Sequence, residues 1–173
     1  MTTAAVTAAR GFDLSPATRT ALLVSGGAIG AVSLYALARA ALGLVSTPPQ
    51  ARELAVIIHL ATVLPALPLG LYLFVSRKGG ARHRLLGRIW MALMAITAIA
   101  ALFIRHLNAG EFSPIHLASV VTLVGIPLAI NAARRRRIAA HRAHLLAMFI
   151  GALLVSGVLS FLPGRIMWHW LFA

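Results

Sequence analysis

The sequence predicts an all-α, polytopic membrane protein with five transmembrane helices. Apolar residues make up 60% of the 173 residues and charged residues only 11%, against roughly 45–50% and about 25% in soluble domains. Five apolar runs approach the length of about 20 residues that an α-helix needs to cross a bilayer. Short connectors join these runs, and no segment of the sequence indicates a strand or a separate soluble domain.

The five expected spans differ in their charged residues. The first is interrupted late by Arg39, the second contains no charge, and the third carries Arg88 near its start. Ser113 and Pro114 are expected to cap and to begin the fourth helix, because proline is favoured at the first helical position. The spans expected within a single transmembrane domain over 1–173 are about 21–44, 54–75, 85–104, 114–133 and 143–162.

The first span also resembles a secretory signal peptide, because it follows two arginines and contains the small-residue segment Ala36-Leu37-Ala38. Its apolar core is longer than the about 7–15 residues that are usual in such peptides. We therefore expect a retained helix. Gly26 and Gly30, four residues apart, give this helix a face on which another helix can pack closely.

The basic residues lie mainly on one side of the expected membrane protein. The formal net charge is +13, and the positive-inside rule places basic connectors in the cytoplasm. We therefore expect the cytoplasmic (inner) membrane, a cytoplasmic N-terminus and an external C-terminus. The basic loops are expected to contact anionic lipid headgroups, and not nucleic acid, because they lack interleaved aromatic residues. The residues on this side are Arg10, Arg19, Arg77, Lys78, Arg82, Arg84, Arg88, Arg134, Arg135, Arg136, Arg137 and Arg142.

The composition excludes several kinds of chemistry. The chain has no cysteine, which excludes disulfides, zinc–thiolate sites, iron–sulfur clusters, thiol nucleophiles and covalent haem attachment through C-x-x-C-H. The three acidic residues, Asp13, Glu53 and Glu111, fall in the tail and in the connectors. Hydrolytic acid–base catalysis within the spans therefore has little support.

Two halves of the chain, about 54–110 and 111–172, repeat one pattern. The segments 58–63 and 115–120 share five of six residues, including His59 and His116. Each half then reaches a basic loop and a His-Arg pair, and the two histidine offsets are 57 and 58 residues. Because each half contains two spans, the copies share one orientation. Spans two to five are therefore expected to form a four-helix bundle built from a parallel two-helix repeat.

The repeat places histidines in two pairs. His59 and His116 begin spans that both start outside, so we expect them at similar depth near the outer face. His83 is expected near the inner face together with either His141 or His144. Two imidazoles from different helices can supply both axial positions of a b-type haem without any cysteine.

Arginines near the inner pair, Arg84, Arg88 and Arg142, suit the haem propionates. One or two haem b groups are therefore expected.

Simpler interpretations apply to the same residues. An isolated histidine near a span end usually makes interfacial hydrogen bonds, as we expect for His106 and His169. The His-Arg pairs can bind lipid phosphate, and the arginines can serve as positive-inside anchors. Glu53, Glu111 and His106 could form an outer zinc site, but their spacing matches no recognised motif.

Three segments resemble a known family. They are His83-Arg84-Leu85-Leu86-Gly87-Arg88-Ile89-Trp90, the later His141-Arg142, and Leu162-Pro163-Gly164-Arg165-Ile166-Met167. Over roughly residues 54–172 the chain is similar to the predicted membrane proteins grouped as domain of unknown function 2306. This resemblance implies a membrane protein and no established activity. The chain departs from it at Ala143-His144, where bulkier, aromatic-rich sequence is expected.

A more distant similarity to another family concerns only the arrangement of the histidines on the helices. Four helices that share histidine pairs between alternate helices resemble the core of cytochrome b561, a two-haem transmembrane electron carrier. The resemblance implies that His59 pairs with His116, and His83 with His141 or His144.

These observations favour a b-type haem protein that transfers electrons across the membrane, as an electron carrier or membrane oxidoreductase. Quinone or a small reductant is the expected exchange partner. Two alternatives stay open. The parallel repeat and the prolines within the spans fit a small membrane transporter. A structural or assembly subunit without a cofactor is the other alternative, in which the histidines bind lipid or a neighbouring protein.

Overall fold

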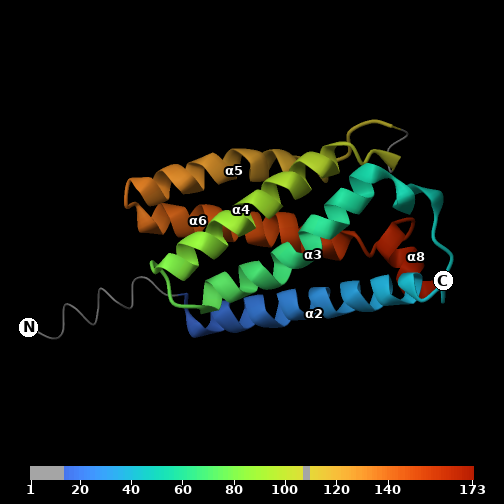
Figure 1. The fold of residues 1–173 in the computed structure, drawn as a ribbon, viewed down its shortest axis with the longest axis horizontal. Coiled ribbons are helices and arrows are strands. Elements are labelled where there is room, and N and C mark those ends of the chain that lie inside the picture. Colours follow the sequence, from blue (N-terminus) through green and yellow to red (C-terminus); the bar gives the residue numbers. More distant parts are fainter. Residues whose placement is uncertain (1–13, 107–109) are drawn as a thin grey trace, which may run out of the picture.

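Long helices that alternate in direction dominate the computed structural model (Figure 1). The structure describes residues 14–106 and 110–173, so Arg10, Asp13 and Asn108 lie outside the described residues. Within the described ranges all regular elements are helical. The long helices are α2 (Pro16–Ala41), α3 (Leu54–Val75), α4 (Ala81–Leu102), α5 (His116–Arg134) and α6 (Ile138–Met148), and α6 continues through the π-helical segment η3 (Phe149–Val155) into α7 (Ser156–Leu159). The short helices are η1 (Pro49–Arg52) and α8 (Ile166–Phe172).

Five helices are long and apolar enough to cross a membrane: α2, α3, α4, α5 and the continuous helix Ile138–Leu159. This confirms the predicted all-α class of a polytopic membrane protein. Three helices begin earlier than predicted, α2 at Pro16, α4 at Ala81 and α6 at Ile138. Each carries an arginine among its first five residues (Arg19, Arg82 and Arg142). An apolar-run criterion misses such turns because long basic side chains reach past the apolar region to water.

The start of α5 corrects one prediction. Its N-cap is Ile115, and Ser113 and Pro114 lie before the helix. The amides of His116 and Leu117 donate to the carbonyls of Ser113 and Pro114 at 2.9 and 3.1 Å. This i to i−3 spacing is that of a tight turn rather than of an α-helix. The expected Ser-Pro cap therefore forms an entry turn.

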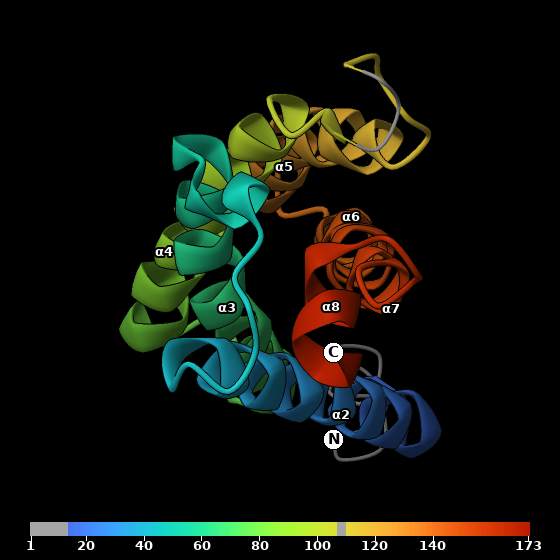
Figure 2. The same cartoon turned by 90° about the vertical axis from the view of Figure 1, so that its right-hand side faces the viewer.

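The helices surround a common centre (Figure 2). In chain order α3, α4, α5 and α6 each pack on the next, while α2 packs on α3 and also on α8. The loops after α3 and α5 lie at one end of the molecule, where most of the basic residues are; we call this the basic end (Figure 1). The starts of α3 and α5, together with α8, lie at the opposite end, which we call the cavity end.

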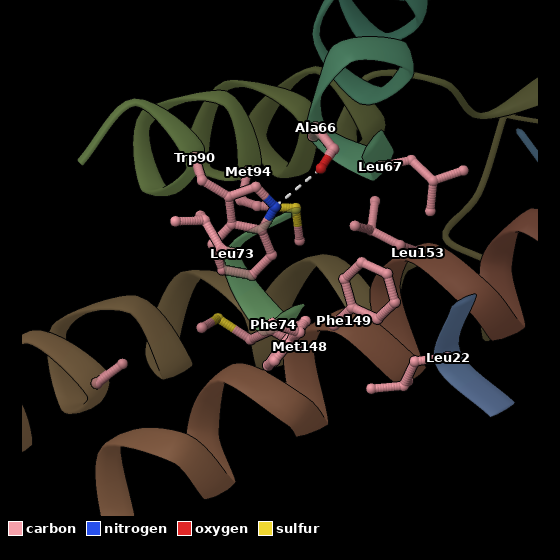
Figure 3. Close-up of a cluster of buried hydrophobic side chains, with 11 residues drawn as sticks. Leu22, Ala66, Leu67, Leu73, Phe74, Trp90, Met94, Met148, Phe149 and Leu153 are labelled. Carbon is pink, nitrogen blue, oxygen red and sulfur yellow. Dashed lines mark hydrogen bonds between the residues drawn. The ribbon is translucent and has the colours of Figure 1, made fainter. Parts of the chain in front are cut away.

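A core of buried apolar side chains joins α3, α4 and η3 (Figure 3). Trp90, Met94 and Phe149 are at most 2% exposed, and the Trp90 indole N–H donates to the Ala66 carbonyl at 2.9 Å. Gly70 makes this packing possible. A Cβ atom there would lie 2.7 Å from Trp90 Nε1 and 2.8 Å from Phe149 Cε2, so no larger residue fits without displacement.

The predicted packing face on α2 is confirmed. A Cβ atom on Gly26 would lie 2.9 Å from Leu71 Cδ2, and one on Gly30 would lie 3.4 Å from Leu67 Cδ2. Both leucines belong to α3. The two glycines therefore bring α2 close to α3.

Helix α8 was not predicted. It packs against α2 through the nearly buried Trp170. Near the end of α2, Arg39 donates hydrogen bonds to the carbonyls of Trp170, Leu171 and Ala173. Because the last carbonyls of a helix have no partner within it, Arg39 acts as the cap that holds α8 against α2. The interruption of span one by an arginine thus has a structural reason.

Candidate functional site

A cavity of about 860 Å³ occupies the centre of the molecule at the cavity end. Residues of α2, α3, α4, α5, η3, α7 and α8 line it. Ligand sites in proteins commonly measure about 300–1,000 Å³, so a cofactor-sized molecule fits in this volume. Both members of the predicted outer pair, His59 and His116, line the cavity from helices α3 and α5.

His59 is fixed by a hydrogen bond to the neighbouring helix. Its Nδ1 atom lies 3.2 Å from the Thr97 carbonyl oxygen. A carbonyl oxygen only accepts, so in the neutral imidazole Nδ1 carries the proton and Nε2 keeps a free lone pair. The Thr97 hydroxyl in turn donates to Thr62 at 2.7 Å. Sequence reasoning missed Thr97, although a buried hydroxyl within an apolar span is a signal for such a role.

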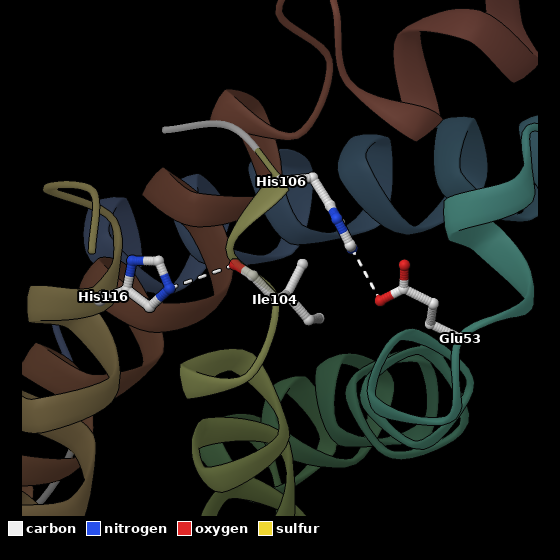
Figure 4. A network of polar contacts seen from close by, with 4 residues as sticks. All are labelled: Glu53, Ile104, His106 and His116. Atoms are coloured by element: carbon white, nitrogen blue, oxygen red, sulfur yellow. Dashed lines mark hydrogen bonds and ion pairs between the residues drawn. The ribbon is translucent and has the colours of Figure 1, made fainter. Parts of the chain in front are cut away.

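His116 is bonded differently from its counterpart in the repeat. The Ser113 backbone N–H donates to its Nδ1 at 2.9 Å, so Nε2 carries the proton and donates to the Ile104 carbonyl at 3.2 Å (Figure 4). The side chain is 5% exposed. Its two nitrogens therefore join the entry turn of α5 to the end of α4. In this arrangement neither nitrogen has a lone pair available to a ligand.

The other histidines of the cavity also contact the protein. His106 Nε2 lies 2.9 Å from Glu53 Oε2 (Figure 4), and His169 Nε2 lies 2.8 Å from the Ser46 hydroxyl. These contacts are interfacial polar contacts of the kind expected for both. Within the described residues no three His, Cys, Asp or Glu side chains gather as a metal site. The zinc site considered for Glu53, Glu111 and His106 is therefore not formed.

Arg165, the N-cap of α8, also lines the cavity, a position that the sequence did not predict. Desolvation by burial lowers the pKa of Arg165 from its ordinary value. A guanidinium nevertheless stays protonated in proteins. Arg165 therefore supplies a fixed positive charge to the rim of the cavity.

At the basic end, His83 lies in the first turn of α4 and His141 in the first turn of α6. His141 Nδ1 donates to the Ala129 carbonyl at 2.9 Å, which leaves the Nε2 lone pair free. His83 Nδ1 is buried and has no hydrogen-bond partner in the described part of the chain. Two of the three histidines predicted for the inner pair therefore lie at the starts of helices at this end.

His144 lies apart from these two residues. It lines a hollow of about 270 Å³ between α5 and α6, together with Val120, Val124 and Leu128. Those three side chains are exposed, so in a membrane they face lipid. His141 and His144 therefore lie in different surroundings.

The arginines predicted near the inner pair lie at the basic end. Arg84 and Arg88 are exposed and Arg142 is half-buried. One guanidinium nitrogen of Arg84 donates to the Gly79 carbonyl at 2.7 Å, which fixes this side chain at the loop before α4. Exposed arginines at a helix end suit both lipid phosphate and the carboxylates of a cofactor.

Comparison with known proteins gives a family but no activity. No curated protein and no solved structure matches the chain. Residues 56–171 match the profile of a family described as predicted membrane protein, domain of unknown function 2306. This segment includes α3 to α7, His59 and the basic-end histidines. The chain therefore belongs to the domain of unknown function 2306 family of predicted membrane proteins.

Proposed function

We propose that this protein is a b-type haem protein that carries electrons across the membrane, with His83 and His141 as the pair of iron ligands. The observation that carries the proposal is the state of these two imidazoles. His83 buries an Nδ1 atom without a partner, and His141 is held by Ala129 in the tautomer that leaves Nε2 free. They come from α4 and α6, which are alternate helices of the bundle.

The donor set fits haem in its chemistry. Haem iron takes neutral imidazole nitrogens as axial ligands, and a ligating histidine typically donates its other N–H to a backbone carbonyl. His141 has this arrangement toward Ala129. A buried nitrogen without a partner costs about 1–3 kcal/mol, and ligation would remove this cost at His83.

Bound haem would supply reversible one-electron exchange at its iron. The protein's own residues would orient and shield it. His141 is positioned by α5, and Arg84, Arg88 and Arg142 would pair with the propionates. The buried side chains of Trp90 and Phe149 exclude water from the centre of the bundle, and such a low-dielectric shell tunes a redox potential.

The pair at the cavity end, His59 and His116, is the less favoured haem site in this proposal. His59 has a free Nε2, and the cavity has room for a cofactor. His116, however, could ligate iron through Nε2 only after losing its hydrogen bond to the Ile104 carbonyl. A second haem between His59 and His116 therefore stays a prediction that depends on this rearrangement.

We also propose that the basic end faces the cytoplasm and contacts anionic lipid headgroups. The support is the position of the basic loops after α3 and α5, both at this end.

The haem proposal is tested by absorbance. The protein is expressed with excess haem, purified, and examined as a reduced-minus-oxidised spectrum, with haem content measured as the pyridine complex. We expect an α-band in the unmodified protein, and its loss in His83→Ala and His141→Ala. His144→Ala is the matched control, because His144 lies one turn along the same helix in a different hollow, and it should keep the band. A colourless unmodified protein, or a band that persists in His141→Ala, would contradict the proposal.

A further inference from the structure

The cavity has an apolar floor and a polar rim. Leu67, Leu71, Met94 and Leu153 line it near the middle of the helices. His106, His169 and Arg165 line it at the cavity end, beyond the ends of the long helices. In a bilayer this places an apolar compartment at mid-depth and a polar one near the surface. An occupant that matches both compartments is an amphiphile with its apolar part deep and its head at the rim.

The histidines that line the cavity differ in how their ring nitrogens are bonded. Four histidines line the cavity, and three of them use Nε2 within the protein. His106 uses it toward Glu53, His116 toward Ile104 and His169 toward Ser46. For Nε2 of His59 the described residues provide no such partner, while its Nδ1 is bonded to Thr97. Among these four Nε2 atoms, that of His59 is therefore the one left to accept from a ligand.

A neutral imidazole acceptor selects a ligand that donates. Ketones, ethers and esters offer only acceptor atoms, so they leave this nitrogen unsatisfied. A phenolic hydroxyl is a better donor to imidazole than an aliphatic one because it is more acidic, with a pKa of about 10 as in tyrosine. The head group that best matches His59 is therefore a phenol.

We propose that the cavity binds a membrane-soluble hydroquinone, whose hydroxyl donates to His59 Nε2 and whose apolar chain lies along Leu67 and Leu71. The cavity volume of about 860 Å³ accommodates an aromatic head with a medium-length chain. This inference uses the cavity end and is independent of haem at His83 and His141. It is an alternative to a second haem between His59 and His116, because both would need His59 Nε2.

The test compares two probes of which only one can donate a hydrogen bond. A decyl-substituted para-hydroquinone and its dimethyl ether have similar apolar surfaces, but the ether cannot donate. Binding is measured without oxygen by titration calorimetry on the full chain in phosphatidylcholine nanodiscs. We expect the ether to bind the unmodified protein about three- to tenfold more weakly, as the loss of one neutral hydrogen bond implies. Equal binding of both probes would overturn the proposal without any mutation.

Two variants locate the site. His59→Leu should reduce hydroquinone affinity to that of the ether and leave the ether unaffected. Gly27→Phe should weaken both probes at least tenfold, because Gly27 lines the cavity and has open space around its Cβ position. The matched controls are His144→Leu and Gly87→Phe, because neither His144 nor Gly87 lines the cavity. A Cβ atom on Gly87, like one on Gly27, would meet no other atom within 4 Å. Both controls should bind as the unmodified protein does.

A competing occupant is an anionic phospholipid held by Arg165. If phosphatidylglycerol in the nanodiscs displaces hydroquinone, and if Arg165→Gln abolishes binding while His59→Leu does not, the ligand is a lipid headgroup and the proposal is wrong. The readout is hydroquinone binding and not haem absorbance. Failure of this inference is therefore distinguishable from failure of the haem proposal.

Discussion

Gly70→Ala should destabilise the helical core by about 2–4 kcal/mol relative to Gly87→Ala, which gains the same helix propensity. The added Cβ would lie 2.7 Å from Trp90 Nε1 and 2.8 and 2.9 Å from two ring carbons of Phe149. Both rings are almost fully buried, so they can move only by disturbing their neighbours. Overpacking of this kind costs about 1–3 kcal/mol. Displacing Trp90 also weakens its hydrogen bond to Ala66, and such bonds between membrane helices contribute about 0.6 and at most about 1.7 kcal/mol.

The measurement is reversible unfolding in mixed detergent micelles, followed by tryptophan fluorescence. Gly87→Ala is the matched control, because its Cβ would meet no atom within 4 Å and both substitutions gain the same helix propensity, about 0.5–1 kcal/mol. Adding Phe149→Leu to Gly70→Ala should recover part of the loss by removing one of the two clashing rings. If Gly70→Ala is as stable as Gly87→Ala, then Gly70 is not required for the contact between α3, α4 and η3.

Two further predictions concern α8 and the orientation of the chain. Arg39→Ala should release α8 from α2, because it removes charged hydrogen bonds to three carbonyls. Such bonds typically contribute about 1.5–3 kcal/mol each. Limited proteolysis should then cut the connector 160–165 faster, and an unchanged rate would refute the role of Arg39. Because the chain has no cysteine, single cysteines report topology directly: an impermeant maleimide applied to intact cells should label Gln50→Cys but not Arg135→Cys. The reverse labelling would mean that the basic end faces outward.

The membrane class and the number of long helices followed from apolar composition and run length, because these properties depend on the bilayer and not on tertiary contacts. Helix ends were less predictable. Arg82 and Arg84 belong to the first turn of α4, but their charge excludes them from an apolar run. Helix α8 was missed because seven residues are too few for periodicity to stand out, and because its anchor, Arg39, lies more than 120 residues away in sequence.

The repeat located the histidines at the correct ends but could not specify their bonds. His59 and His116 occupy equivalent positions in sequence, yet one bonds through a single nitrogen to Thr97 and the other through both nitrogens to Ser113 and Ile104. The difference arises from where the helices begin: α5 begins at His116 itself, next to its entry turn, whereas α3 begins at Leu54, five residues before His59. Likewise His141 and His144, three residues apart, project into different surroundings, which sequence alone left as alternatives.

The π-helical segment Phe149–Val155 has a consequence for how one helix can serve two different neighbourhoods. An α-helix turns by about 100° per residue. A π-helical turn contains more residues than an α-helical one, so it changes the direction in which all later side chains of the helix point. Met148, just before the segment, and Phe149, its first residue, pack in the core. Ser156 and Gly157, just after the segment, line the cavity. Deleting one residue from the segment would rotate the part of the helix after it relative to the part before it. The segment therefore sets the angle between the face that packs in the core and the face that lines the cavity.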